Sequence, residues 1–100
     1  MLKEEAVLMI KCPYCGRESN EYNWSLATAA RYSIREETCP VLIQVLLATI
    51  NGEGEFFAGY RLVCPKCYYG VNFEELTLPA EKDIREYAAK AGEDYCQMWL

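Results

Sequence analysis

The chain has 100 residues, of which 52% are hydrophobic and 25% charged, with six cysteines, no histidine and a formal net charge of −5. This length suits one domain with a modest core, and the composition excludes a disordered chain. Without histidine, the chain has no imidazole for acid–base catalysis, for Ser-His or Cys-His pairs, or for metal binding. The acidic balance argues against a protein whose main ligand is a phosphate backbone, because such proteins carry a basic face.

The first ten residues do not have the pattern of a targeting signal. They contain Glu4 and Glu5 and only a short apolar run, whereas a secretory signal has a basic start and a longer apolar region. The longest apolar stretch of the chain, residues 41–50, is too short to cross a bilayer. We therefore expect a cytoplasmic protein with no membrane partner, and in that reducing compartment cysteines act as metal ligands more often than as disulfides.

The motif Cys-Pro-x-Cys occurs twice, at residues 12–15 and 64–67. Each copy follows a short apolar segment, 7–11 or 60–63, which predicts a strand that runs into a tight turn. With two residues between the cysteines, such a turn directs both thiolates to one metal ion, and the amides that follow donate hydrogen bonds to the sulfurs. One turn supplies half of a tetrahedral site and two turns complete it.

Residues 24–34 fit two patterns. Apolar and polar side chains alternate from Trp24 to Ile34, which is the period of a strand. The alanine content and the spacing of Leu26, Ala30 and Ile34 instead favour a helix with one apolar face. We favour the strand, and the helix is the alternative.

Residues 41–50 and 55–64 are predicted to pair as antiparallel strands across an Asn-Gly-Glu-Gly turn. Pairing Ile50 with Glu55 makes one face of this hairpin almost wholly apolar and the other face mixed. The alternative is a helix over 40–50 that ends at the Asn-Gly pair. The β-branched residues of this run favour the strand.

Residues 79–92 predict an amphipathic helix, with a proline in the first turn, Ile84 and Tyr87 on an apolar stripe, and Gly92 as its end. The segment after it, residues 95–100, finishes on Met-Trp-Leu. We expect this tail to fold back over the mixed face of the predicted sheet, and an exposed anchor for a partner is the alternative.

Together these elements predict a single α+β domain over residues 1–100, a small β-meander with a strand insert at 24–63 and a C-terminal helix over 79–92. We predict that its two turns hold one structural Zn²⁺ through four thiolates: Cys12, Cys15, Cys64 and Cys67. Four protein ligands leave zinc no open position for water or substrate, so we expect no catalytic residues.

The two turns and their flanking strands, residues 7–17 and 60–73, resemble the knuckles of the zinc-ribbon superfamily, with the four cysteines in its ligand positions. The interval between the turns is long for a minimal ribbon, and the rest of the chain does not resemble a particular family. The resemblance implies a role in binding and scaffolding within transcription, translation or RNA-processing assemblies.

Three other uses of the cysteines stay open. Six cysteines can form three disulfides, although the start of the chain does not have the pattern of a secretory signal. Cys-Pro-Tyr-Cys at 12–15 matches the active-site tetrapeptide of glutaredoxins, but the polar residues after it are a poor helix start for such a site. A rubredoxin-like iron site is the third, because four thiolates do not separate iron from zinc by spacing. Gly16 after the first motif fits that resemblance, whereas Tyr68 stands at the equivalent place after the second.

Cys39 and Cys96 lie outside the motifs, and we expect buried, inert thiols at both positions. A disulfide between them, or their use as substitute ligands, is the alternative. The tyrosine pair at 68–69 is expected at the surface beside the second turn, and most of the other aromatic rings are expected in the core.

We predict a non-enzymatic adaptor whose partner is another macromolecule, with a protein favoured. Nucleic-acid binding is the first alternative, since aromatic rings and arginines together can stack on bases. A rubredoxin-like electron carrier is the second alternative. The sequence does not set the oligomeric state.

Overall fold

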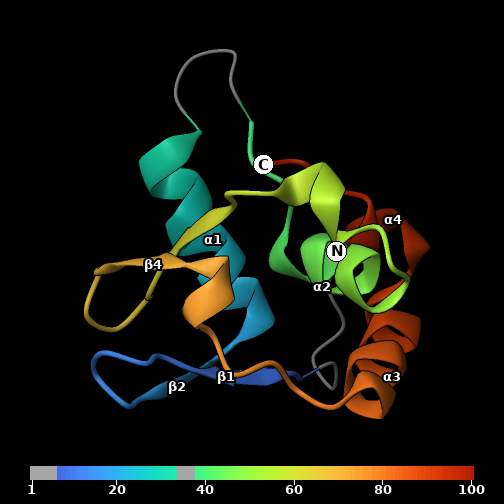
Figure 1. The fold of residues 1–100 in the computed structure, drawn as a ribbon, viewed down its shortest axis with the longest axis horizontal. Coiled ribbons are helices and arrows are strands. Elements are labelled where there is room, and N and C mark those ends of the chain that lie inside the picture. The colour runs from blue at the N-terminus through green and yellow to red at the C-terminus, as the bar shows by residue number, and fades with distance from the viewer. Residues whose placement is uncertain (1–6, 34–37) are drawn as a thin grey trace.

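The structure is a computed structural model that describes residues 7–33 and 38–100. The turns of two short hairpins lie at the left of Figure 1, and helices α2, α3 and α4 lie at the right. The elements in chain order are β1 (Met9–Lys11), β2 (Glu18–Asn20), α1 (Glu21–Tyr32), α2 (Leu42–Ile50), the 3₁₀ turn η1 (Gly54–Phe57), β3 (Arg61–Val63), β4 (Gly70–Asn72), the 3₁₀ turn η2 (Phe73–Glu75), α3 (Glu81–Ala91) and α4 (Glu93–Cys96). This set of elements confirms the predicted α+β class. Within the described ranges, none of the helices has the length and apolar character that a bilayer crossing demands.

The two hairpins have the same construction. In the antiparallel pair β1–β2, Ile10 lies opposite Ser19, and in β3–β4, Leu62 lies opposite Val71. One further backbone hydrogen bond closes the open end of each hairpin, at 2.9 Å in the first and 3.0 Å in the second. Each second strand ends at an asparagine that is the N-cap of the next helical segment. The repeated motif therefore belongs to a repeated structural unit, although the sequence surrounding the two copies differs.

The strand predicted at 24–34 is wrong, because residues 24–32 belong to helix α1 and residue 33 is its C-cap; residue 34 lies outside the described residues. The buried side chains of α1 share one helical face: Glu21, Trp24, Ser25 and Thr28. Ser25 and Thr28 face inward because hydrogen bonds satisfy their hydroxyls, while the apolar Leu26 is exposed. The alternating pattern misled because polar residues occupy part of the buried face.

The strand predicted at 41–50 is also wrong, and the helix of the alternative prediction is present. Helix α2 runs from Leu42 to Ile50, with Asn51 as its C-cap. Its apolar residues face α1 and α3 on two sides, so helical geometry buries several of them at once. A β-branched residue costs only a few tenths of a kcal/mol in helix propensity. Burial of one large apolar side chain contributes about 1.5–3 kcal/mol, so packing decides the conformation.

The predicted partner strand at 55–64 is correct only at its end. Residues 61–63 form β3, but the partner of β3 is β4. The residues before it form the 3₁₀ turn η1, so the predicted pairing of Ile50 with Glu55 does not occur. The strand insert predicted at 24–63 is therefore mainly helical, and each hairpin is built around its own cysteine turn.

The C-terminal helix is confirmed, and the tail folds back against the domain but leaves Trp99 50% exposed. Helix α3 buries Ile84, Tyr87 and Ala91 and ends at Gly92, which has a φ of 97°. The backbone of Leu100 then pairs with that of Cys39, through hydrogen bonds of 2.8 and 2.9 Å. The tail thus packs beside residues 39–41 instead of on a sheet face, because no sheet forms over 41–50.

Among the residues that the structure describes, Glu21 is the one charged side chain in the core. Its carboxylate accepts hydrogen bonds from the hydroxyls of Tyr87 (2.6 Å) and Tyr95 (2.7 Å). It also accepts bonds from the Ser25 hydroxyl at 2.9 Å and from the Ile43 amide at 2.6 Å. The last contact lies at the N-terminus of α2, where unpaired amides favour an anionic acceptor. Glu21 therefore joins α1, α2, α3 and α4, and burial beside its charge raises the pKa of both tyrosines.

Candidate metal centre

The structure brings the four cysteines of the two motifs together. Cys12 and Cys64 directly follow β1 and β3, and Cys15 and Cys67 lie in the turns. All four sulfur atoms lie within 4.8 Å of one another. The Sγ atoms of Cys12 and Cys67 are 3.8 Å apart, and those of Cys15 and Cys64 are also 3.8 Å apart. Residues far apart in the chain thus form one cluster of four thiols.

The size of the cluster fits a tetrahedral metal ion. Four sulfurs at about 2.3 Å from zinc are separated by roughly 3.8 Å along each edge of the tetrahedron. The two sulfur–sulfur distances of 3.8 Å match this edge. The other sulfur pairs lie within 4.8 Å, so the cluster would contract only slightly around an ion. Thiolates are soft ligands that select zinc, iron or copper(I) over magnesium or calcium. The four cysteines could therefore hold one thiophilic metal ion.

Backbone amides in each turn are directed at the first sulfur of the motif. In the first turn, the amides of Tyr14 and Cys15 donate to the Sγ atom of Cys12, at 3.4 and 3.5 Å. In the second turn, the amides of Lys66 and Cys67 donate to Cys64 at 3.3 and 3.5 Å. Such hydrogen bonds stabilise negative charge on sulfur. The expected turn geometry is thus present twice.

The two turns differ at the residue that follows the second cysteine. Gly16 has a φ of 74° and Tyr68 has a φ of 60°. Each donates its amide to the carbonyl of the first cysteine, at 3.0 Å in the first turn and 2.8 Å in the second. A residue with a β-carbon loses about 1–2 kcal/mol in this left-handed conformation. The second turn therefore has the geometry of the first with a less suitable residue.

Burial and local amides set different pKa values within the cluster. Burial raises the pKa of the Cys12 and Cys64 thiols, and the smaller burial of Cys67 also raises its pKa. The Arg17 amide donates a hydrogen bond that, as the largest effect, lowers the pKa of Cys15 to about 7. A local amide thus favours the thiolate form of Cys15, whereas burial opposes it at the other three cysteines.

Helix α1 holds both hairpins in place beside the cluster. The indole N–H of Trp24 donates to the Ile10 carbonyl in β1 at 3.0 Å. One turn later, the Thr28 hydroxyl accepts the Val63 amide of β3 at 3.0 Å. These buried contacts join one helix to the strand that precedes each cysteine turn. Helix α1 thereby links the two strands that lead into the cysteine turns.

Sequence analysis missed the residues of α1 that position the second turn. Besides Thr28, Arg31 supports it, because its guanidinium donates to the Tyr68 carbonyl at 3.1 Å. The spacing of Trp24, Thr28 and Arg31 by four and three residues was the available signal, and it requires a helix. The preference for a strand over 24–34 concealed it.

Three tyrosines surround the solvent side of the cluster. The rings of Tyr14 and Tyr69 are tilted against each other with centroids 4.6 Å apart. The Tyr14 hydroxyl donates to the carboxylate of Glu75, which raises the pKa of Tyr14 and lowers that of Glu75. Tyr68 and Tyr69 are both exposed, as expected. The first turn thus contacts residues that follow the second turn.

The two remaining cysteines are not part of the cluster. Cys96 is buried, its thiol donates towards the Ala88 carbonyl at 3.6 Å, and burial raises its pKa to about 11. Such a thiol stays protonated and unreactive. Cys39 is half-buried, and its backbone pairs with the tail. The expectation of a buried thiol is confirmed for Cys96 and holds in part for Cys39.

Comparison with protein-family models, with curated proteins and with solved structures finds no match to this chain. The resemblance to zinc-ribbon knuckles is therefore limited to the local geometry of the two turns. What the fold and the site define is an α+β protein with a four-cysteine cluster suited to a metal ion.

Proposed function

We propose that this chain is a non-enzymatic zinc-binding adaptor that binds another protein. In this proposal one structural Zn²⁺ is held by Cys12, Cys15, Cys64 and Cys67, and the folded domain presents surfaces to a partner. The observation that carries it is the cluster of four sulfurs with two separations of 3.8 Å. Four thiolates complete a tetrahedron, so the metal has no open position for a substrate. A reducing, cytoplasmic location agrees with thiols that remain available to metal.

The fold gives a physical reason for a structural metal. Each hairpin has strands of three residues, and isolated two-stranded hairpins are at best marginally stable in water. A structural zinc ion contributes an apparent 10–16 kcal/mol at neutral pH, as order-of-magnitude values for zinc-finger peptides. In this chain the ion would join the two hairpins to each other, while α1 joins both to the core.

Metal content after expression without added metal tests the proposal. We expect zinc bound one to one in the purified protein, and unfolding when a strong chelator removes it. Cys64→Ser should lose the metal, whereas Cys39→Ser, outside the cluster, should keep it. A folded protein without metal would overturn the proposal, and a red iron-containing protein would favour the electron carrier in its place.

Nucleic-acid binding is the second candidate, and one surface favours it. The exposed rings of Tyr14, Tyr68 and Tyr69 lie beside the exposed Arg17 and Lys66 of the same turns. Aromatic rings with neighbouring cations are typical of single-strand binding. The acidic net charge opposes it, and bound Zn²⁺ with four thiolates adds further negative charge. Retardation of single-stranded oligonucleotides that weakens steeply with added salt would favour this candidate over a protein partner.

A further inference from the structure

A groove lies between α2, η1 and the tail. It has a volume of about 490 Å³ and an apolar lining that comes from three separate segments: Leu47, Ala48, Phe56, Phe57, Cys96 and Trp99. The elements that form it lie to the right of and above the cysteine turns in Figure 1. The groove is thus separate from the metal centre and from the tyrosines around it.

Two aromatic side chains of the groove are exposed to solvent. Phe56 is 77% exposed and Trp99 is 50% exposed, and the rings of Phe57 and Trp99 have centroids 6.2 Å apart. Exposed aromatic side chains of this size, gathered in one place, are typical of interaction sites.

Backbone contacts fix the positions of Phe56 and Trp99 in the chain. The Phe56 amide donates to the Glu53 carbonyl at 3.1 Å within η1. Trp99 forms a β-bridge with Pro40, flanked by hydrogen bonds between the tail and residues 39–41. The backbone at both positions is therefore ordered by local contacts. A preformed apolar surface loses less entropy on binding than a mobile one.

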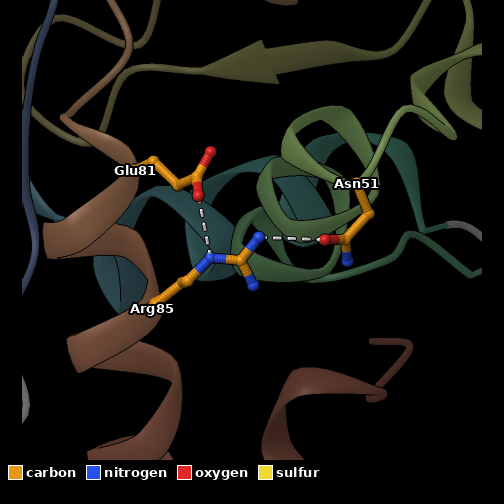
Figure 2. A network of polar contacts seen from close by, with 3 residues as sticks. All are labelled: Asn51, Glu81 and Arg85. Atoms are coloured by element: carbon orange, nitrogen blue, oxygen red, sulfur yellow. Dashed lines mark hydrogen bonds and ion pairs between the residues drawn. The ribbon is translucent and has the colours of Figure 1, made fainter.

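Among the described residues that line the groove, Glu53 is the one charged residue, and the segments that supply the lining are acidic. Residues 53–57 and 93–99 contain four acidic side chains and no lysine or arginine: Glu53, Glu55, Glu93 and Asp94. Helix α2, the third wall, has no charged residue. Arg85 comes close to the groove through Asn51, but Figure 2 shows its guanidinium held by Asn51 and Glu81, with both contacts at 3.1 Å. An occupant therefore meets apolar rings with the Glu53 carboxylate beside them and further acidic residues in the adjoining segments.

We propose that this groove binds a basic amphipathic segment of a partner protein, with apolar side chains against Phe56 and Trp99 and lysine or arginine beside the carboxylates. This inference rests on the proposed adaptor function and specifies its docking surface. A second copy of the chain would place like charges against each other, which costs affinity. An anionic membrane or a nucleic acid would be repelled for the same reason.

The test uses the zinc-loaded full chain and two synthetic helices, one of leucine and lysine and one of leucine and glutamate. Binding is followed by shifts of backbone amide resonances. We expect the leucine–lysine helix to shift resonances of 44–57 and 96–100 and to leave the cysteine turns unchanged. The leucine–glutamate helix should not bind. Equal binding of both helices, or shifts centred on the turns, would overturn the inference.

Variants sharpen the test. Phe56→Ala should weaken binding of the leucine–lysine helix about tenfold, the usual effect of an aromatic anchor. Leu26→Ala, which removes an exposed apolar side chain on α1, should leave it unchanged and is the matched control. The double variant Glu53→Lys with Glu55→Lys should weaken it and permit binding of the leucine–glutamate helix. Unchanged affinity in Phe56→Ala would overturn the inference.

Two further readouts separate this inference from the other possibilities. Concentration-dependent broadening of groove resonances without any peptide would show a second copy as the occupant and overturn the basic partner. Zinc content is measured on the same samples. Absence of zinc from the folded chain overturns the adaptor function. A zinc-loaded protein whose groove does not bind the leucine–lysine helix overturns only the docking surface.

Discussion

The first hairpin turns at Gly16 and the second makes the same turn at Tyr68, with φ angles of 74° and 60°. Beyond this point the two hairpins obtain support in different ways. The second receives a hydrogen bond from Arg31 to its turn carbonyl. The first turn has its glycine. In the strand that follows it, the buried Ser19 hydroxyl has no hydrogen-bond partner among the described residues, and Val71 holds the corresponding position of the second hairpin. The same turn geometry is thus formed with a glycine in the first hairpin and with Tyr68 in the second, where Arg31 supports the turn.

The cysteines give the largest expected effect. Replacing any of the four with serine should lose the metal and most of the folded structure, because three thiolates leave the tetrahedron incomplete. We expect Cys12→Ser and Cys64→Ser to be at least as damaging as Cys15→Ser and Cys67→Ser, since they also accept the turn amides. Zinc content and circular dichroism measure both effects. A strong difference between the first and second hairpins would show that one of them folds before the metal binds.

The next prediction concerns the hydrogen bonds from α1 to the two hairpins. Thr28→Val keeps the shape of the side chain but leaves the buried Val63 amide unpaired, which costs about 1–3 kcal/mol of unfolding free energy. Hydrogen exchange should then accelerate first in β3–β4. Trp24→Phe removes the corresponding contact to Ile10, and exchange should accelerate first in β1–β2. Urea unfolding of the zinc-loaded protein measures the free energy. Equal acceleration in both hairpins for each variant would contradict separate support.

The support from α1 also shows how far the sequence can be read. The four-cysteine site follows from short motifs, because each turn depends on residues within a few positions of one another. The conformation of α1 depends on partners that are distant in the chain: Thr28 pairs with Val63, and Ser25 receives the Leu42 amide at 2.8 Å. Local periodicity does not contain these contacts, and the alternation over 24–34 therefore predicts a strand with Thr28 on its apolar face and Ser25 on its polar face.

Glu21 is a second feature that the sequence does not reveal. Its carboxylate contacts lie on α1, α2, α3 and α4, and they become neighbours only in the folded chain. A glutamate at the start of a helix is ordinarily a solvated residue. The C-terminal helix, by contrast, could be predicted, because its apolar stripe and its terminal glycine are local signals, although it begins at Glu81, after the proline expected in its first turn.

Substitutions at Gly16 and Tyr68 test the difference between the two turns. Tyr68→Gly should raise the unfolding free energy by up to about 1 kcal/mol, because relief of the left-handed strain exceeds the entropy that glycine adds to the unfolded chain. Gly16→Ala should lower it by about 1 kcal/mol. A β-carbon at Gly16 meets no atom within 4 Å, so its cost is conformational and not steric. Urea unfolding measures the unfolding free energy of both variants. An increase in Gly16→Ala would contradict the strain assigned to a β-carbon at this turn position.

The smallest expected effect concerns Arg31. Arg31→Met keeps much of the side-chain length on α1 but removes the hydrogen bond to the Tyr68 carbonyl, an exposed contact that contributes about 0.5–1 kcal/mol. The loss should be confined to the second turn, so hydrogen exchange should accelerate for residues 67–70 and stay unchanged for 15–18. In the background of Tyr68→Gly, whose turn has no strain to oppose, Arg31→Met should cost less than it does alone. A double-mutant cycle over these two positions measures that coupling, and strict additivity would show that Arg31 does not hold the strained turn.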